Sequence, residues 1–475
     1  MSSSSGLLRI LVVIALGLFG YFLYTLDLFK STPIAVQTFL HLNPTEQIPI
    51  DDNSAWNPER RISLEVESQS KIKSYKIRAT TGDGVVVLEQ EEVVTNRPEK
   101  LRIWLPRPEI DLPDNTKLHY EVAITDWSNA NFFSGETLVK HLDFTINTKQ
   151  PVITILAHSP RISYGGSALV VFHVESVDIK SITITNGKDT FVPFPFVAQG
   201  YYAVILAWPL SNQNFSGRIQ VSDTALNARS ITIPFIKDTS PRYQASTLKL
   251  QEQFLRDKMD GLISEIKAIR YEPELDELHD DFEKFVYINE QVRLKDEAII
   301  AESAYQACLQ DAQNTNFPIE WGPFIPLKGY SVVGRFGDKR TYVNAQGKTS
   351  QSLHLGLDIA SVKNDRIIIA NNGRVILGQK LGVYGNTIMI DHGFGVASLY
   401  AHLSDFLVSN EQEVLAGDVA GLTGESGWAF GDHLHFGMLV QGLSVRNVEW
   451  LDSRWIKHNI TDILAQAKLL INQAQ

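Results

Sequence analysis

Apolar and polar residues alternate along most of the first half of the chain. Ile62-Ser-Leu-Glu-Val66, Leu118-His-Tyr-Glu-Val122 and Ile219-Gln-Val221 place an apolar side chain at every second position. Because successive side chains of a strand point to opposite faces, this period of two predicts half-buried β-strands. Polar turn residues such as Pro113-Asp-Asn115 separate the strands. We therefore expect a mainly β protein in this region.

Two stretches within the β-rich region resemble each other. Tyr120-Glu-Val-Ala-Ile-Thr-Asp126 is similar to Arg218-Ile-Gln-Val-Ser-Asp223, and each is followed by a strand and a polar turn that ends in proline. The copies lie roughly 90–100 residues apart, which is the size of an immunoglobulin-like sandwich. The sequence predicts two immunoglobulin-like β modules, at 33–149 and 150–241. They serve either as a spacer or as a binding module, and we favour the spacer.

The pattern changes to a helical one after about residue 246. Apolar residues recur every three or four positions in two stripes, which is the spacing of one helix face. The first stripe is Leu255, Met259, Leu262, Ile266 and Ile269, and the second is Leu278, Phe282, Phe285 and Val292. A helical hairpin segment is therefore expected at 246–315, with the acidic run at 272–283 on a solvated face. Its apolar stripes either pack on each other or also rest on the neighbouring domain and gate it.

The N-terminal residues 1–30 carry a long apolar run. No charged residue occurs from Ile10 to Leu26, and roughly 20 apolar residues span a bilayer. A cleaved secretion signal and a retained transmembrane helix both fit, but no small-x-small cleavage pattern follows. We predict a retained anchor. Arg9 before the run favours an N-terminus in the cytoplasm, which implies a single-pass protein of the cell inner membrane with its bulk in the periplasm.

Charge and cysteine content narrow the chemistry. The 475 residues include 43 basic and 54 acidic side chains, a net charge of −11, so nucleic acid is not expected as a partner. Cys308 is the single cysteine. It excludes an internal disulfide and a cysteine-rich zinc site, and we expect it to be a packing residue. A metal site in this chain must use histidine and carboxylate ligands.

Histidines gather in the last third of the chain. His354 and Asp358 are four residues apart, and His433 and His435 alternate in Gly431-Asp-His-Leu-His-Phe-Gly437. On a strand the two alternating histidines face the same side, and His402 lies between the two pairs. Catalytic zinc commonly has three nitrogen or oxygen ligands and one open position. One histidine and the aspartate of the first pair, with one histidine of the second, would supply that set.

Residues of about 325–442 resemble the M23 (LytM, lysostaphin-type) zinc metallopeptidase family, and the chain is similar to its membrane-anchored bacterial members. The matching stretches are His354-Leu-Gly-Leu-Asp358, Ile369-Ala-Asn-Asn-Gly-Arg-Val375, Tyr384-Gly-Asn-Thr-Ile-Met-Ile-Asp-His-Gly393, Tyr400-Ala-His-Leu403, Ala416-Gly-Asp-Val419, Gly421-Leu-Thr-Gly424 and Gly431-Asp-His-Leu-His-Phe436. The resemblance implies an antiparallel-β LytM-type peptidase domain, which we place at 316–455, followed by a C-terminal helix at 456–475.

The resemblance also implies a role for each residue. His354, Asp358 and His435 match the zinc ligands of the family. His433 matches the catalytic histidine that acts on the attacking water, and His402 matches the one that helps to hold the polarised carbonyl or the oxyanion.

Three further residues lie within the matching segments. We interpret His392 as structural, whereas Asp391 and Asp432 either orient a histidine or form turns. The chain departs from many members at Gly437-Met438, where an acid is common after the last motif. That departure touches no ligand position.

Two functions follow from the resemblance. The first is a zinc metalloendopeptidase that hydrolyses the peptide cross-links of bacterial peptidoglycan, with peptide stems as substrate and an envelope protein regulator as a further expected partner. The second is a catalytically silent LytM-like regulator that activates another wall hydrolase. Silent members typically lose ligands or catalytic histidines, whereas this chain keeps all five, so the enzyme is favoured. Whether it cuts a direct D-alanyl–diaminopimelate cross-link or a glycine bridge stays open.

Overall fold

The computed structural model describes residues 4–25, 33–176, 178–313 and 320–474. The described part is mainly β, as expected, and its contacts divide it into two compact units. One unit contains the residues up to Pro151, together with 178–180 and Ser222–Ala228. The other contains Val152–Ser176, Ser181–Val221 and the residues from Arg229 onward.

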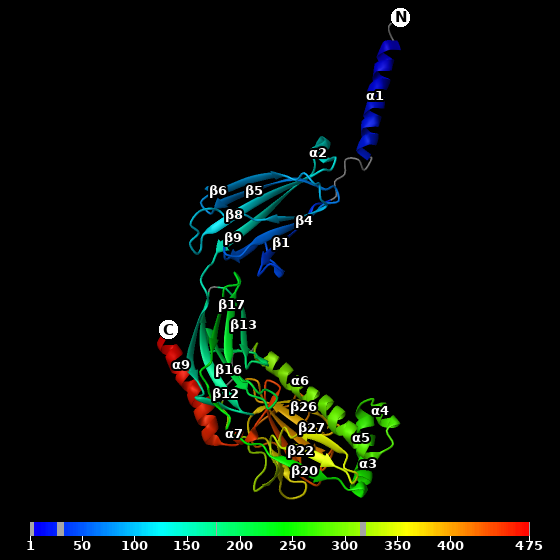
Figure 1. Ribbon diagram of the computed structural model, residues 1–475, viewed down its shortest axis with the longest axis vertical. Helices are drawn as coiled ribbons and strands as arrows, with labels where there is room; N and C mark the ends of the chain where they lie inside the picture. The colour runs from blue at the N-terminus through cyan, green and yellow to red at the C-terminus, as the bar shows by residue number, and fades with distance from the viewer. Residues whose placement is uncertain (1–3, 26–32, 177, 314–319, 475) are drawn as a thin grey trace. The chain divides into compact units, whose positions relative to one another are not determined.

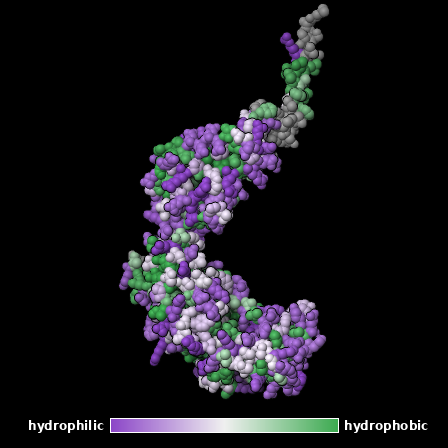
Figure 2. Space-filling view, viewed as in Figure 1, coloured by the Kyte–Doolittle hydropathy of each residue, from purple (hydrophilic) through white to green (hydrophobic). Residues whose placement is uncertain are grey.

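The N-terminal run forms helix α1, Ser4–Thr25 (Figure 1). Its apolar side chains from Ile10 to Phe22 are exposed and stand out in the hydropathy view (Figure 2). Among the residues that the structure describes, however, no helix is both long enough and apolar enough to cross a membrane. The prediction of a transmembrane anchor at 1–30 is therefore not supported; residues 1–3 and 26–30 of that range lie outside the described residues.

Two sheets form a sandwich in the first unit. One sheet has the order β2-β1-β4-β7: β1 Ala35–His41, β2 Gln47–Pro49, β4 Ile62–Glu67 and β7 Lys100–Trp104. The other has the order β3-β9-β8-β5-β6: β3 Asn53–Trp56, β5 Ile72–Thr81, β6 Val86–Val93, β8 Lys117–Asp126 and β9 Thr137–Ile146, with the short helix α2 at Ala130–Phe133. Both sheets share one apolar core. Trp56, Tyr120 and Phe144 lie at its centre, with ring centroids 5.4–6.3 Å apart.

A second set of strands follows in chain order. It comprises β10 Val152–His158, β11 Arg161–Ser163, β12 Ser167–Glu175, β13 Ile179–Thr185, β14 Thr190–Phe191, β15 Phe194–Phe196, β16 Ala198–Ala207, β17 Arg218–Asp223, β18 Ala228–Thr232 and β19 Ile236–Asp238. The sheets are β10-β12-β16-β15, β14-β13-β17-β18 and the pair β11-β19. Both predicted modules therefore contain the β-strands that the alternating pattern predicts. The immunoglobulin-like topology of the two modules stays a prediction.

This second module is docked onto the C-terminal part of the same unit. The backbone N–H of Val192 donates to Oε1 of Gln441 (2.8 Å), and Nε2 of Gln441 donates to the carbonyl of Val192 (3.0 Å). Nearby, the N–H of Ser167 donates to the buried Glu449 (3.1 Å). These contacts fix the module to the C-terminal domain, so within the second unit it is not a free spacer.

The end of the chain reinforces this docking. Its helices are α7 Asn447–Trp450, α8 Ser453–Ile456 and α9 Asp462–Ala474, with a π-helical turn at Lys457–Thr461. Helix α9 packs against β10 and β12 rather than against the C-terminal domain alone (Figure 1). The C-terminal helix expected at 456–475 therefore closes back onto the module that precedes the domain.

The C-terminal domain is built on an antiparallel eight-stranded sheet with the order β21-β24-β32-β28-β27-β26-β30, to which β33 adds at β32. Its strands are β21 Ser331–Gly334, β24 Leu357–Ala360, β26 Gly373–Leu381, β27 Gly385–Asp391, β28 Val396–Leu403, β30 Glu413–Val414, β32 Leu434–Val440 and β33 Leu443–Val445. A small sheet, β25-β31-β29, covers one end: β25 Arg366–Ile368, β29 Asp405–Phe406 and β31 Val419–Leu422. A third sheet has the order β20-β22-β23: β20 Ala245–Lys249, β22 Lys339–Val343 and β23 Thr349–Leu353.

The helical segment differs from the expected hairpin. It contains α3 Glu252–Ile269, α4 Glu274–Glu277, α5 Asp281–Tyr287, a π-helical turn Ile288–Val292 and α6 Arg293–Asp311. Seven of the nine residues in the predicted apolar stripes are buried, whereas Ile269 is exposed and Leu278 is half-buried. The buried ones pack on the sheet face of β26 and β27 as well as on each other (Figure 1). The acidic run is also not wholly solvated, because Glu272 is buried and pairs with Lys295 (2.6 Å).

Two buried carboxyls join the end of α6 to β27. Burial raises the pKa of Asp391 to about 8, the nearby Asp311 carboxyl adds to the rise, and burial likewise raises the pKa of Asp311. A raised folded-state pKa means that the folded chain holds a proton that the unfolded chain releases at a lower pH. The stability contributed by this proton is complete below about pH 4 and is lost as the pH rises toward about 8.

Replacing Asp391 with asparagine should remove this pH dependence. The amide keeps an acceptor for the N–H of Gly393 and adds a donor for Asp311. We expect the midpoint of thermal unfolding to fall less between about pH 5 and about pH 8 in Asp391→Asn than in the unchanged chain. The exposed Asp260→Asn is the control. Parallel unfolding curves for all three proteins would show that the pair does not share a proton.

Candidate metal centre and catalytic pocket

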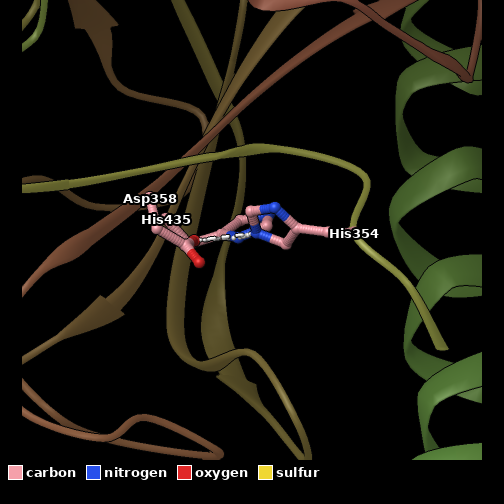
Figure 3. Close-up of side chains that lie close together, drawn as sticks. All are labelled: His354, Asp358 and His435. Atoms are coloured by element: carbon pink, nitrogen blue, oxygen red, sulfur yellow. Dashed lines mark hydrogen bonds and ion pairs between the residues drawn. The ribbon is translucent and has the colours of Figure 1, made fainter. Parts of the chain in front are cut away.

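Three predicted ligands converge at the centre of the eight-stranded sheet. Asp358 lies on β24 directly opposite His435 on β32, so the sheet register brings together residues 77 positions apart. His354 follows β23 and turns its ring toward both of them (Figure 3). All three side chains are buried. The structure thus assembles from three segments the cluster that the sequence predicted.

The three potential ligand atoms are nearly equidistant. Nε2 of His354 lies 2.8 Å from Oδ1 of Asp358 and 3.0 Å from Nδ1 of His435, and Nδ1 of His435 lies 2.9 Å from the same carboxylate oxygen. Nδ1 of His354 donates to the carbonyl of Arg335 (2.8 Å), which leaves the lone pair of Nε2 directed at the cluster. In a tetrahedral zinc site with bonds of about 2.0–2.1 Å, donor atoms lie about 3.3 Å apart.

The chemistry of this donor set fits a cation. Two imidazole nitrogens and a carboxylate oxygen face one another, and at most one hydrogen lies between them, so a positive ion satisfies all three. Gly356 has no room for a side chain, because a Cβ there would lie 2.4 Å from Nε2 of His435. The glycine within the first motif therefore allows the second motif to approach. The residues present fit a zinc ion with three protein ligands.

Electrostatics favour the metal-binding forms of Asp358 and His435. Burial raises the pKa of Asp358, but the neighbouring His354 and His435 together outweigh this effect, and the net pKa lies well below the usual value. Burial lowers the pKa of His435 to about 4, although its hydrogen bond with Asp358 opposes the shift. An ionised carboxylate and a neutral imidazole are the forms that coordinate metal.

Arg340 is a further part of this cluster that the sequence did not reveal. Its Nη2 donates to Oδ2 of Asp358 (2.8 Å), the carboxylate oxygen that does not face the two histidines. The fit is tight, because a Cβ on Gly334 would lie 2.4 Å from that oxygen and 2.5 Å from Nη2. Arg340 therefore leaves only Oδ1 available to a metal and fixes the rotamer of the ligand.

Replacing Arg340 with leucine should weaken zinc binding by about 10- to 100-fold, as is typical when a residue that orients a ligand is lost. The reason is that Asp358 loses its fixed orientation, while the other two donors, His354 and His435, stay in place. Zinc affinity is measured by competition with a chromophoric chelator. Arg340→Lys keeps the charge and should recover part of the loss. Equal affinities in all three proteins would contradict the orienting role.

His402 and His433 stand beside the cluster. The two rings are 4.9 Å apart between centroids, and Nε2 of His433 lies 3.8 Å from Oδ1 of Asp358. Nδ1 of His402 donates to the carbonyl of Ser426 and Nδ1 of His433 donates to that of Gly431, each over 2.8 Å. In both neutral rings Nε2 is therefore a proton acceptor.

The backbone explains how His402 reaches the site from a strand. Its φ is +65°, and the pairing of β27 with β28 shifts register at this point. A residue in the left-handed region at a bulge redirects its side chain out of the regular alternation. Such strained positions occur often at functional sites.

One pocket contains all five of these side chains. It has a volume of about 670 Å³, and its lining includes Leu248 of β20, Arg293 of α6 and Phe430. Phe254 of α3 stacks on Phe430, with ring centroids 5.0 Å apart and planes 10° from parallel. The strand β20 and the helical segment therefore build one wall of the pocket.

The remaining candidates lie outside the cluster. His392 is buried between the carbonyl of Asn372 and the hydroxyl of Ser398, which agrees with the structural interpretation. Asp432 accepts hydrogen bonds from Thr423 (2.6 Å) and from the N–H of Asn364 (3.1 Å), a turn role. Cys308 is fully buried, as expected.

Comparison with known proteins agrees with this geometry. Residues 352–447 match the model of peptidase family M23. This part of the chain is an M23 domain. The match includes the segments of all five clustered residues and excludes Arg293 and Arg340.

Curated relatives match about a fifth of the chain. The DD-carboxypeptidase/endopeptidase Mpg of Neisseria meningitidis serogroup B is 38% identical over 96 residues, which are 20% of this chain and 22% of the relative. The murein hydrolase activator NlpD of Escherichia coli (strain K12) is 38% identical over 106 residues, 22% of this chain and 28% of the relative. The chain thus spans about a quarter of the length of these relatives.

A solved structure is also similar to part of the chain. The catalytic domain of the antimicrobial peptidase lysostaphin from Staphylococcus simulans shares 23% of its sequence with the aligned part of this chain. The alignment covers 26% of this chain and 92% of that one, with a TM-score of 0.23.

Proposed function

We propose that the protein is a zinc metalloendopeptidase that hydrolyses peptide cross-links of bacterial peptidoglycan. The observation that carries the proposal is the convergence of five side chains in one pocket: His354, Asp358 and His435 as metal donors, with His402 and His433 beside them. The relatives of this chain include a DD-carboxypeptidase/endopeptidase. Because the substrate lies outside the cytoplasmic membrane, we also propose an extracytoplasmic location for the catalytic domain.

The donor cluster would hold zinc, and when bound zinc supplies Lewis-acid chemistry that polarises the scissile carbonyl and makes water a better nucleophile. Nε2 of His433 is an acceptor close to the cluster. It can take the proton from the attacking water and give it to the leaving amine. The hydrogen bond of Nδ1 with Gly431 fixes the ring in this tautomer.

The role of His402 depends on the protonation state of its ring. Its Nδ1 hydrogen is committed to the carbonyl of Ser426, so its Nε2 accepts a hydrogen bond when the ring is neutral. Burial lowers the pKa of His402 well below its usual value, with further lowering from His433 and His435. Holding an oxyanion, the role expected from the family resemblance, requires Nε2–H. The ring must therefore gain a proton during the reaction to play that part.

A hydrolysis assay on purified sacculi tests the proposal. The full-length chain should release soluble peptide fragments, a chelator should stop the release, and added zinc should restore it. His433→Ala is the inactive control. No release by the zinc-loaded chain would overturn the proposal.

The regulator is the second candidate, because the activator NlpD and the endopeptidase Mpg are each 38% identical to this chain over their matched residues. A regulator would release nothing alone and would instead stimulate a separate wall hydrolase in a mixed assay. The intact set of five residues is what favours the enzyme.

A further inference from the structure

Arg293 is the one residue of α6 that lines the pocket of the five clustered side chains. It belongs to the helical segment, outside the M23 match. Its side chain is half-buried. Partial burial of a guanidinium destabilises the fold unless an opposite charge or hydrogen bonds compensate its positive charge.

None of the ion pairs among the described residues includes Arg293. Its charge acts on Glu297, one turn later on α6, but burial raises the pKa of that carboxyl to about 7 and so leaves it only a partial counter-charge. The hydrogen bonds of Arg293 go to neutral groups of Asn289, one turn earlier: Nε and Nη2 donate to Oδ1 over 3.2 and 2.9 Å, and Nε also contacts the carbonyl over 3.2 Å. Nη1 keeps its hydrogens available.

The other charges that line the pocket are already engaged. Arg340 pairs with Asp358. Asp432 accepts from Thr423 and Asn364. Oδ2 of Asp338 accepts from the N–H of Arg335 (3.2 Å), while its buried Oδ1 has no hydrogen-bond partner among the described residues. Among the described lining residues, Arg293 is therefore the charged group without a charged or polar partner beyond its own helix.

The guanidinium is also held in place. Asn289, which accepts its hydrogen bonds, donates from Nδ2 to the hydroxyl of Ser350 (2.9 Å) and to the carbonyl of Gln351 (3.1 Å). Both lie on β23, which leads directly into His354. The same strand thus fixes the cation and the metal donor. Preorganised positive charge of this kind suits recognition of a carboxylate by two parallel hydrogen bonds.

We propose that Arg293 binds a free carboxylate of the substrate beside the scissile bond and so selects a cross-link that carries one. This inference rests on the proposed function. In a direct D-alanyl–diaminopimelate cross-link, the carbon that bears the leaving amine also bears a carboxylate, whereas a glycine bridge has no charged group there. Arg293 therefore favours the direct cross-link and makes the helical segment part of the specificity of the enzyme.

Two peptides test the assignment. Both contain the cross-linked bond, and they differ only in that this carboxylate is free in one and a carboxamide in the other. For the zinc-loaded full-length chain, Arg293→Gln should lower kcat/KM for the free acid by about 10- to 100-fold, mainly through KM. On the carboxamide, the variant and the unchanged chain should be equal. Arg293→Lys should recover part of the loss. The exposed Arg256→Gln on α3 is the matched control and should change neither value.

Binding of the same peptides by calorimetry provides a readout apart from turnover. The unchanged chain should bind the free acid more tightly than the carboxamide, and Arg293→Gln should not distinguish them. An equal loss on both peptides would assign Arg293 a structural role and overturn the proposal. If the unchanged chain cleaves neither peptide, the proposed function fails, while a binding preference that depends on Arg293 would still support the carboxylate site.

Discussion

Replacing His433 with alanine is expected to lower the rate of peptide hydrolysis by about 10²–10⁴ while the zinc content stays near one ion per chain. The reason is geometric. Nε2 of His433 lies 3.8 Å from Oδ1 of Asp358, beside the donor cluster, whereas Nδ1 of His435 lies 2.9 Å from that oxygen and completes the cluster. Removing the first side chain takes away a proton acceptor, and removing the second takes away a ligand.

His435→Ala is the matched variant from the same motif. It should lose most of the zinc, measured by metal analysis after dialysis, because a neutral nitrogen ligand is gone. His402→Ala should resemble His433→Ala, with zinc kept and rate lost. If His433→Ala empties the site and His435→Ala does not, then the assignments within the alternating pair are reversed.

The sequence predicted the clustered side chains because their chemistry is carried by residue type and short spacing. His354 and Asp358 in one motif, and His433 and His435 in another, are visible without a structure. Their convergence depends on the pairing of β24 with β32, which sets Asp358 opposite His435. Two motifs of one family predict this pairing, but spacing along the chain alone does not.

Other parts of the site leave no such signal. Arg340 lies on β22, which forms a hairpin with β23 and pairs in parallel with β20. That contact joins residues almost a hundred positions apart. The carbonyls that orient the rings belong to Arg335, Ser426 and Gly431. Since every residue has a backbone carbonyl, the sequence does not indicate which carbonyls orient the histidine rings.

The docking of the second β module was also missed, for a physical reason. Its interface uses single polar contacts such as Ser167 with Glu449 and Gln441 with the backbone of Val192. Burial raises the pKa of Glu449 to about 7, which marks it in the structure as a carboxyl removed from water. In the sequence it is one of many acidic residues.

The helical segment is expected to stabilise the peptidase domain rather than to restrain it. The alternative left open by the sequence was a gate that rests on the groove, in which case a chain that begins near Phe317 would cleave faster. The structure favours packing instead. The core shared with the sheet contains many side chains of the segment, among them Leu255, Met259, Leu262, Ile266, Phe282, Phe285, Ile288 and Val292. At about 1.5–3 kcal/mol for each, the burial of these eight is comparable to or greater than the total stability of a typical domain, about 5–15 kcal/mol. The shortened chain should therefore fail to fold.

Asp296 ties this segment to the turn between β26 and β27. Its carboxylate accepts from the N–H groups of Gly382 (3.2 Å) and Val383 (2.6 Å) and pairs with Arg270. It is fully buried. Removing it leaves two backbone donors without a partner and takes from Arg270 the closer of its two carboxylates, the other being Glu272 at 4.0 Å.

Asp296→Ala in the full-length chain is therefore expected to lower the free energy of unfolding by about 3–5 kcal/mol. Met259→Ala, which opens a cavity in the same core, should cost about 2–5 kcal/mol, and the adjacent exposed Asp260→Ala should cost less than about 0.5 kcal/mol. Denaturant unfolding measures each value. Peptide hydrolysis is then compared at a temperature at which all four proteins are folded and zinc-loaded. If the segment is a structural wall, loosening it gives equal or lower rates, since the wall also positions Arg293 and Leu248 in the pocket. A faster rate in Asp296→Ala and Met259→Ala, but not in Asp260→Ala, would instead establish that the segment gates the site.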